Sequence, residues 1–413
     1  MRSGTPAGDG PPGADGDPAA VLPPPLLRAV ERILSDAGGA PARIVSASRL
    51  AGRDHVVRVV GASGAQAVVK RARADEPGWW GRAADEFASE WAALELLASV
   101  PGSPAVTLIG GDAEAGVLVV EHLDVERTVA DSLLGADGDR ARADVVAYGA
   151  LLGTVHGATI GRVDELVALR RRHGVADAGE TRWSAPLRLG RDAFLQGLVA
   201  LRIAAPGGPG ALERELDRVG AVIAGGGRRG LVHGDPCPDN VVVAGGRLRL
   251  LDFERATPGH VALDAGYLVA PFPSCWCFAR LPADVVAAAR AAHRGALEAA
   301  GVDPGDDWDE AIAAALATWL VVRGPNLVEA LGDDPPEPWG TTTMRPRLVA
   351  WADACAGAPG AAAFPAVRAA AADLAERLRS AWPEVVIPGY PGLVGPGEPA
   401  VSAPDDWEPT VPP

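Results

Sequence analysis

The sequence contains very little lysine and asparagine. Of its 38 lysine and arginine residues only one is a lysine, Lys70, and the only asparagines are Asn240 and Asn326. Alanine, glycine, arginine and proline are abundant, as the codons of a GC-rich genome tend to give. Drift in such a genome tends to remove lysine and asparagine, so a specific chemical need is a reasonable hypothesis wherever one of them persists.

Cysteine is scarce as well. Four cysteines in 413 residues (Cys237, Cys275, Cys277 and Cys355) are too few for a disulfide scaffold. The N-terminus lacks a basic segment followed by an apolar one. No run of about 18 apolar residues, the length of a membrane-spanning helix, occurs anywhere. Together these absences predict a protein of the reducing cytoplasm.

Aromatic residues make up only 5% of the chain, whereas apolar residues make up 48%, much of it alanine. This balance disfavours a β-rich sandwich and favours tightly packed, alanine-rich helices. The length is sufficient for two or three domains of roughly 150 residues each.

The net charge of −15 excludes several classes of partner. A chain this acidic is repelled by nucleic acid and by anionic membranes unless it carries a basic patch. The densest basic run, RRRH at 170–173, resembles one face of a helix. A cationic small substrate would suit this field, although acidity more often serves solubility alone. Nothing in the sequence indicates an oligomeric state.

The first third of the chain reads as a tail followed by a small lobe. Residues 1–24 are rich in proline, glycine and aspartate without periodicity, which is typical of disorder. We expect a lobe over 25–123 that combines helices with antiparallel strands. The expected helices are 26–36 and 82–98, and the expected strands are 43–50, 55–60, 67–72, 106–110 and 116–123.

Helical patterns dominate the second part of the chain, which we expect to form a larger lobe over 124–385. Clear helical periodicity covers 143–159, 211–225 and most of 281–382. A strand–loop–strand segment at 231–254 interrupts these helices. From 386 onward the sequence reads as a proline-rich tail, and no internal repeat is visible.

The densest group of chemically functional residues lies in that strand–loop–strand segment. Asp235 and Asn240 occupy the loop between two β-like runs, and Asp252 ends the second run. This order predicts two carboxylates and an amide oxygen on one rim, and hard oxygen ligands of this kind suit Mg²⁺. Phosphoryl transfer needs such a metal, together with a carboxylate that orients and deprotonates the attacking hydroxyl.

The spacing His-x-Asp-x₄-Asn, followed twelve residues after the asparagine by Asp-Phe, resembles the catalytic and metal loops of protein kinases. It is more similar to the aminoglycoside phosphotransferase family, in which the second loop usually reads Asp, aromatic, Glu. Here Asp252, Phe253 and Glu254 are followed after twelve residues by Asp264. Upstream, LLGTVHG (151–157), AVVK (67–70), FASEWAALELL and VLVVEHL (117–123) resemble further family segments in the correct order.

The resemblance covers roughly 40–270 and implies a two-lobed α+β fold like that of protein kinases, with ATP or GTP and Mg²⁺ bound between the lobes. It implies transfer of the γ-phosphoryl group to a hydroxyl of a small molecule, such as an aminoglycoside-like antibiotic or an amino-alcohol. For the reaction, the resemblance implies that Asp235 is the base and that Asn240 and Asp252 are metal ligands. For nucleotide binding, it implies that Lys70 contacts the phosphates and pairs with Glu90. It also implies that Glu121 and Leu123 are hinge residues whose backbone groups contact the adenine. The expected phosphate loop, 49–59, departs from the G-x-G-x-x-G pattern because Gly52 is its only glycine.

The composition supports two of these roles independently of any family. The single lysine lies on the strand where a kinase needs an ammonium group, and one of only two asparagines lies at the metal position. Arginine is a planar fork and lysine a compact point charge, so arginine is no substitute at such a site.

Less specific interpretations exist for several residues. Asp235 follows a glycine and precedes a proline, as a simple turn residue would. Glu86 lies one helical turn before Glu90 on the same face, although Leu94 and Leu97 follow Glu90 as in the family. We expect His233 and His156 to be structural.

We expect Asp264 to brace the catalytic loop through backbone N–H groups. The Cys275-Trp276-Cys277 segment suggests a metal, but no second pair of ligands stands at zinc spacing, so we expect buried packing residues.

Two other functions remain open from sequence alone. A catalytically silent nucleotide-binding or interaction module would share the fold, although Lys70, Asp235, Asn240 and Asp252 are all present. A protein kinase is disfavoured because only about eleven residues separate Glu254 from the next helical stretch, too few for an activation loop.

Overall fold

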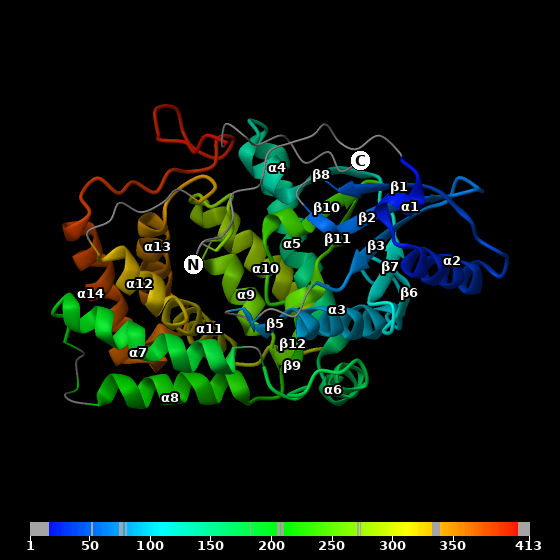
Figure 1. Cartoon of the computed structure of the whole chain (residues 1–413). Helices are drawn as coiled ribbons and strands as arrows, with labels where there is room; N and C mark the ends of the chain where they lie inside the picture. The colour runs from blue at the N-terminus through cyan, green and yellow to red at the C-terminus, as the bar shows by residue number, and fades with distance from the viewer. Residues whose placement is uncertain are drawn as a thin grey trace.

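The computed structural model describes residues 16–50, 53–73, 77–78, 81–181, 183–204, 207, 210–270, 272, 274–332 and 339–403. The chain forms a sheet-bearing N-terminal lobe and a larger, mainly helical C-terminal lobe (Figure 1). The predicted α+β, two-lobed fold is therefore confirmed.

The N-terminal lobe is built on a five-stranded antiparallel sheet in the order β1-β2-β3-β7-β6. Alternating residues of each strand pack on opposite faces, so that Ala67 and Val69 of β3 join the apolar core beneath helix α2, while Lys70 lies on the other face. The elements are α1 (Pro18–Val21), α2 (Pro24–Gly38), β1 (Ile44–Leu50), β2 (Arg53–Gly61), β3 (Gln66–Arg71), β4 (Pro77–Gly78), β5 (Gly81–Arg82), α3 (Ala83–Ala98), β6 (Leu108–Asp112) and β7 (Val117–Glu121).

The predicted disorder over 1–24 is wrong for the described part of that segment. The Asp17 side chain accepts a hydrogen bond from Ala19 N and caps α1, which begins with a proline at its first position. Gly16 exchanges two backbone hydrogen bonds with Ala47 of β1, and Leu22 is fully buried. Proline and aspartate here start a helix, a local role that a compositional argument overlooks.

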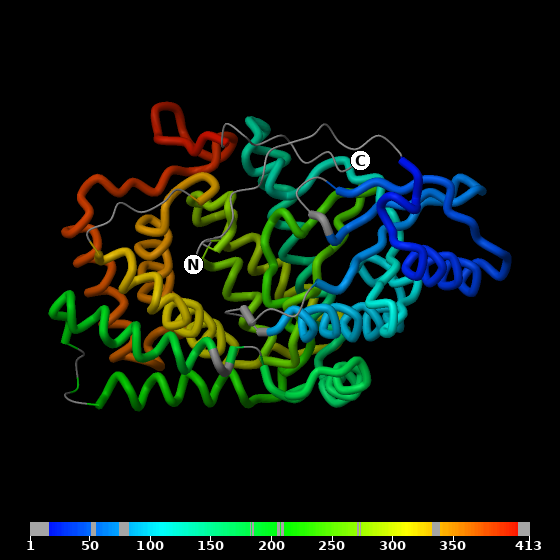
Figure 2. Tube along the Cα trace, in the orientation of Figure 1, coloured from blue at the N-terminus to red at the C-terminus, as the bar shows by residue number. Residues whose placement is uncertain are grey.

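In the C-terminal lobe, helix α5 lies in the middle of the molecule beside α10, and α7, α8, α13 and α14 lie on the side away from the N-terminal lobe (Figure 2). Its strands are β8 (Val125–Thr128), β9 (Arg229–Val232), β10 (Val241–Ala244), β11 (Arg247–Leu250) and β12 (Thr257–His260). Its helices are α4 (Val129–Leu134), α5 (Gly138–Thr159), α6 (Val163–Arg172), α7 (Ser184–Ala200), α8 (Ala211–Ala224), α9 (Ala262–Val269), α10 (Ala283–Ala299), α11 (Trp308–Val321), α12 (Gly324–Ala330), α13 (Met344–Ala356) and α14 (Pro365–Ala381). Short 3₁₀ turns occur at η1 (Pro238–Asn240), η2 (Phe253–Arg255) and η3 (Ala361–Ala363).

Two small sheets position the loops that carry the candidate site. β10 pairs with β11 so that Val241 lies opposite Leu250, and β9 pairs with β12 so that Val232 lies opposite Thr257. The loop from 233 to 240 therefore runs beside the segment from 251 to 256. This pairing brings the two motif-bearing loops together, as the strand–loop–strand prediction requires.

The described part of the C-terminal segment packs onto the helical lobe. Gly389 forms isolated backbone bridges with Arg280 and Ala400, and the side chain of Tyr390 is fully buried. Among the described residues, no single helix is long and apolar enough to cross a membrane, although the bent pair α11–α12 would pass on length and composition alone.

Helices α5 and α10 touch along a line of glycines in α5, namely Gly149, Gly153 and Gly157. A Cβ atom at Gly153 would lie 2.4 Å from the carbonyl oxygen of His293 and 2.7 Å from the Cβ of Ala296. Because such approaches are shorter than van der Waals contact, only glycine allows the two backbones to lie this close.

We expect Gly153→Ala to destabilise the protein by about 1–3 kcal/mol, because α10 must move away from α5. Gly295→Ala on α10 is a matched control, since a Cβ there meets nothing within 4 Å. That change should be neutral or stabilising by up to about 1 kcal/mol, because alanine favours the helix. Urea unfolding measures both, and equal effects of the two variants would contradict the close-contact explanation.

Candidate active site

Lys70 joins the two lobes through a partly buried ionic cluster. Its Nζ lies 2.5 Å from Glu90 Oε1 on α3 and 2.9 Å from Asp252 Oδ1 in the C-terminal lobe. Burial by itself lowers the pKa of Lys70, but the charges of Asp252 and Glu90 outweigh it and raise that pKa above its ordinary value. The only lysine of the chain is therefore held as an ammonium ion between two carboxylates.

The structure distinguishes between the two candidate glutamates of α3. Glu90 is buried and bonds to Lys70, whereas Glu86 pairs with Arg73, which also lies 3.3 Å from Glu254. The two glutamates share a helical face but meet different partners, because β3 presents Lys70 deeper in the cleft than Arg73. The preference for Glu90 is confirmed as a contact.

Asp264 braces the loop that carries Asp235. Its carboxylate is fully buried and accepts hydrogen bonds from His233 N at 2.6 Å and Gly234 N at 3.1 Å. It also lies 3.2 Å from the Nε2 of His156, which is itself fully buried. The bracing prediction for Asp264 is confirmed by these bonds.

The loop contains one residue that must be glycine. Gly234 has a φ of +78°, and a Cβ there would lie 2.5 Å from the carbonyl oxygen of Arg255. His233 takes a structural role, as expected: its Nε2 bonds to the Leu251 carbonyl at 2.8 Å and its Nδ1 accepts from Asp235 N at 3.3 Å.

We expect Asp264→Ala to reduce the free energy of unfolding by about 2–4 kcal/mol. The change leaves two buried N–H donors and the ring of His156 without this acceptor, and each unpaired buried group costs about 1–3 kcal/mol. Urea unfolding with an unchanged m-value measures the loss. Asp373→Ala on the exposed side of α14 is the control and should change stability by less than about 0.5 kcal/mol. A similarly small change at Asp264 would contradict the bracing role.

The side chain of Asp235 is partly exposed and has two neighbours. An Arg255 NH1 atom lies 3.2 Å from Oδ2, and the Cys237 thiol donates to Oδ1 at 3.2 Å. A hydrogen bond with Cys275 and burial raise the pKa of Cys237 well above its usual range, so this sulfur keeps its proton. The Asp235 carboxylate therefore lies between a guanidinium group and a protonated thiol.

Asn240 and Asp252 lie on adjoining chain segments. The Leu251 N–H donates to the Asn240 carbonyl at 2.9 Å, and Asp252 follows directly. The Asn240 side-chain nitrogen donates to the Asp235 backbone carbonyl at 2.9 Å, which leaves the amide oxygen as a possible ligand. Asp252 has a left-handed backbone, with φ 65° and ψ 61°. Aspartate tolerates this conformation, which is frequent at functional sites.

The oxygen donors fit a hard divalent cation. An amide oxygen from Asn240 and the Asp252 carboxylate, which uses Oδ1 for Lys70, are ligands that Mg²⁺ accepts. Both donors are hard oxygen atoms, and the sulfur of Cys237 bonds instead to Asp235 and Tyr267. The donor chemistry of the two residues therefore matches the predicted metal.

Glu254 completes the acidic side of the cleft. Lys70, Arg73, Glu90, Asp252 and Glu254 help to line a cavity of about 20 Å³. This space admits little more than a water molecule. Burial, followed by the charges of Asp252 and Glu86, raises the pKa of Glu254 to about 7.

The raised pKa of Glu254 makes stability depend on pH. The folded protein holds this proton more tightly than the unfolded chain, whose glutamate titrates near 4.5, so stability falls as the pH rises from about 4.5 to 7. Glutamine does not titrate, so the Glu254→Gln protein should lack this fall in the free energy of unfolding, which we expect to be on the order of 2–3 kcal/mol in the wild type. Urea unfolding of both proteins from pH 4 to 8 measures the difference. Parallel curves across this range would contradict the prediction.

The predicted hinge lies where β7 leaves the sheet. The Glu121 side chain accepts from Thr107 N at 2.7 Å and pairs with Arg249 of β11, so it ties the end of β7 to the C-terminal lobe. Burial alone would raise the pKa of Glu121, but these hydrogen bonds lower it. Leu123 follows in a half-buried position. Gly52, the predicted phosphate-loop glycine, lies outside the described residues.

Sequence reasoning missed three groups around Asp235. Arg255 and Cys237 contact its carboxylate, and the Tyr148 hydroxyl donates to the Pro236 carbonyl at 2.5 Å. The position of Arg255 directly after the Asp-Phe-Glu motif is a usable signal for the first contact. The Tyr148 contact joins α5 to the loop over 88 residues of sequence and leaves no local pattern.

A comparison with solved structures found several chains to which this chain is similar. The choline kinase LicA from Streptococcus pneumoniae is 15% identical, with 79% of this chain and 99% of that chain covered and a TM-score of 0.43. The macrolide 2′-phosphotransferase MphH from Brachybacterium faecium is 18% identical, with 75% of this chain and 100% of that chain covered and a TM-score of 0.43. An aminoglycoside phosphotransferase from Alicyclobacillus acidocaldarius is 16% identical, with 82% of this chain and 93% of that chain covered and a TM-score of 0.42.

A search of curated proteins found no match. The sequence model of the phosphotransferase enzyme family, APH, matches residues 47–308, which is more than half of the chain and includes Lys70, Glu90, Asp235, Asn240 and Asp252. This match confirms the family that the motifs indicated. The chain belongs to the phosphotransferase enzyme family.

Proposed function

We propose that this protein transfers the γ-phosphoryl group of ATP, or of GTP, to a hydroxyl group of a small molecule. The observation that carries the proposal is the cluster of Lys70, Glu90 and Asp252, in which one ammonium lies within 3 Å of a carboxylate from each lobe. It lies beside the braced loop of Asp235 and Asn240. Family membership supports the same reaction class.

Asp235 is the proposed base. It accepts the proton of the acceptor hydroxyl as the acceptor oxygen bonds to the γ-phosphorus, and the bond between that phosphorus and the β–γ bridging oxygen breaks to release the nucleoside diphosphate. Asp264 fixes the position of the loop, so that the carboxylate meets the hydroxyl in one geometry. The Arg255 guanidinium lies 3.2 Å from Asp235 Oδ2 and limits the directions in which this carboxylate can turn.

Asn240 and Asp252 are the proposed ligands for Mg²⁺. The bound metal would neutralise charge on the phosphates during transfer. Lys70 is the proposed ligand of the α- and β-phosphates, and Glu90 keeps its ammonium group directed into the cleft. The backbone groups of Glu121 and Leu123 are the proposed contacts for the nucleotide base.

We propose an acceptor of the amino-alcohol class, which includes aminoglycoside-like antibiotics. The net charge of −15 favours a cationic ligand at long range. Close to the base, however, Arg255 carries a positive charge that would repel an amine. The acceptor hydroxyl must therefore approach Asp235 with its amine directed away from Arg255. We further propose that the protein acts in the cytoplasm, where its buried thiols stay reduced.

A two-step experiment tests this function. An amine-reactive acyl phosphate of ATP should modify Lys70, the only lysine in the chain, and free ATP should prevent the reaction. The protein is then incubated with Mg²⁺, with ATP or GTP, and with a panel of antibiotics and metabolic amino-alcohols. Mass spectrometry should detect one phosphoryl group on an acceptor. A silent nucleotide-binding module would give a different result. ATP would still protect Lys70 from labelling, but turnover with every acceptor would be no higher than that of the Asp235→Asn variant.

A further inference from the structure

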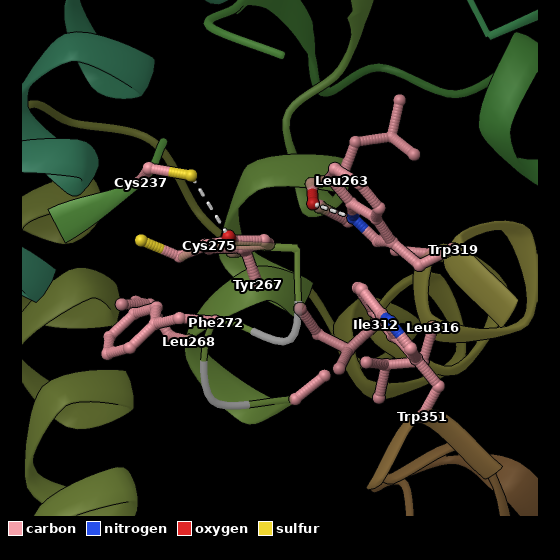
Figure 3. Packing of buried hydrophobic residues seen from close by; sticks show 14 of the residues in the cluster. Cys237, Leu263, Tyr267, Leu268, Phe272, Cys275, Ile312, Leu316, Trp319 and Trp351 are labelled. Carbon is pink, nitrogen blue, oxygen red and sulfur yellow. Dashed lines mark hydrogen bonds between the residues drawn. The ribbon is translucent and has the colours of Figure 1, made fainter. Parts of the chain in front are cut away.

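Three of the four cysteines meet beside the catalytic loop. Cys237 comes from that loop, and Cys275 and Cys277 come from the segment after α9, which is distant in sequence. Figure 3 shows Cys237 and Cys275 next to the hydroxyl of Tyr267, which lies 3.2 Å from the Cys237 sulfur. The sulfur atoms of Cys275 and Cys277 are 3.0 Å apart. All three side chains are buried.

A carboxylate completes this group. The donor atoms of Cys237, Asp239 and Cys275 all lie within 4.8 Å of one another. Around a tetrahedral zinc ion with bonds of about 2.3 Å, neighbouring sulfur atoms are separated by roughly 3.8 Å. Cys237, Asp239 and Cys275 therefore need only small displacements to surround one ion, and Cys277 adjoins them through the 3.0 Å contact of its sulfur with that of Cys275. From the sequence, Cys275 and Cys277 were expected to be buried packing residues. That expectation did not consider Cys237 and Asp239 of the catalytic loop as further ligands.

The surroundings orient and balance such a site. The Trp276 indole N–H donates to Asp239 Oδ2 at 3.0 Å, the kind of hydrogen bond that fixes a ligating carboxylate. Arg347 is fully buried, and its guanidinium group bonds to the carbonyl of Cys275 and, at 2.9 Å, to that of Trp339. A buried positive charge at this place offsets the charge of several thiolates.

We propose that Cys237, Asp239, Cys275 and Cys277 form a binding site for one zinc ion, separate from the magnesium ligands. Thiolates and carboxylates are both ligand types that tetrahedral zinc accepts, and such soft sulfur ligands reject magnesium. Zn²⁺ replaces the protons of three thiols, so three protons are released and no oxidant or reductant is needed. The site joins the catalytic loop to the segment between α9 and α10.

Metal binding at this site changes the hydrogen bonding of the base. The Cys237 thiol donates to Asp235 Oδ1 in the metal-free protein, and a zinc-bound thiolate has no proton to donate. Zinc therefore removes one hydrogen bond from Asp235 and leaves that oxygen free to accept from a substrate hydroxyl. The site does not depend on the phosphotransferase activity, so its test does not depend on finding the acceptor.

The test uses Co²⁺ as a spectroscopic substitute for Zn²⁺ in the reduced, full-length protein. We expect one equivalent of Co²⁺ to produce a thiolate charge-transfer band and the intense visible bands of a tetrahedral site, and Zn²⁺ to abolish them. A pH indicator should report about three protons released per zinc ion. A wild-type protein without the charge-transfer band would overturn the proposal, whatever any variant does.

Variants identify the ligands. Cys275→Ser should abolish the charge-transfer band or weaken it strongly, whereas Cys355→Ser, at a buried cysteine of α13, should leave it unchanged. Trp276→Phe should weaken zinc binding about 10–100-fold, because Asp239 loses its orienting partner. Circular dichroism and thermal unfolding verify that each variant is folded. The zinc site would also be overturned if the isolated wild-type protein contained a Cys237–Cys275 or Cys275–Cys277 disulfide and did not respond to Co²⁺. Mass spectrometry would detect such a disulfide as the loss of two hydrogen atoms.

Discussion

Replacing Asp235 by asparagine is expected to lower kcat by roughly 10²–10⁴-fold while the KM for the nucleotide changes little. The amide keeps the size of the carboxylate but cannot accept the proton of the acceptor hydroxyl. The nucleotide contacts proposed for Lys70, Asn240 and Asp252 remain intact, so the loss should fall on the chemical step. Steady-state kinetics with the acceptor identified in the screen measures both constants.

The effect must be separated from a loss of folding. Asp235 is partly exposed, so its asparagine variant should keep a thermal unfolding temperature within a few degrees of the wild type. Asp373→Asn, on the exposed side of α14, controls for the removal of one carboxylate from an acidic protein. An Asp235→Asn enzyme with near-wild-type kcat would assign the proton transfer to another group and remove Asp235 from the mechanism.

Replacing Lys70 by methionine is expected to reduce kcat/KM for the nucleotide by roughly 10²–10³-fold, comparable to the loss of one preorganised electrostatic contact. Lys70→Arg should not restore activity, because the wider guanidinium fork does not fit between Glu90 and Asp252. Methionine also leaves the buried Glu90 without its cation, so we expect a stability loss of about 3–5 kcal/mol.

A double variant separates the two consequences. Lys70→Met combined with Glu90→Gln removes the uncompensated buried charge, so stability should largely return while activity stays low. Glu86→Gln is the matched control, since this glutamate pairs with the exposed Arg73 on the same face of α3. If the Glu86 and Glu90 variants lose activity equally, the Lys70–Glu90 pair has no special role in nucleotide binding.

Much of this architecture follows from local periodicity. The strand over 67–72 was predicted from β-branched residues in a short run, and β3 (Gln66–Arg71) occupies nearly the same positions. The helix over 82–98 matches α3 (Ala83–Ala98) because its apolar residues recur every three or four positions. Both patterns reflect one buried face, so they can be read without the rest of the chain.

Other elements have no such signature. The short strands β8 and β12 contain Glu126 and Pro258, residues that are unusual in strands, and they form because a partner strand is already in place. The strand–loop–strand prediction placed Asp235, Asn240 and Asp252 near one another. It did not predict the left-handed backbone of Asp252 or the contact of Arg255 with Asp235. The backbone conformation of Asp252 depends on long-range packing that one sequence does not encode locally, whereas the position of Arg255 beside the motif was a signal that went unused.

The cysteine group shows the same limit more sharply. Spacing rules for zinc look for two pairs of ligands, and this chain has one pair, Cys275 and Cys277. The other two donors, Cys237 and Asp239, are separated from it by about 40 residues and become neighbours only through the fold. A pattern search therefore excludes the site, whereas the folded chain assembles it.

The position of Lys70 has a consequence for the resting protein. With Glu90 and Asp252 each contributing a negative charge, the Lys70 ammonium leaves this group of three side chains only singly negative, and it already pairs with the carboxylate proposed as a magnesium ligand. The ammonium thus acts as an internal counter-ion. If nucleotide and metal bind as proposed, the ammonium would turn toward the phosphates and leave Asp252 Oδ1 to the metal, so binding of the nucleotide and binding of the cation would favour each other.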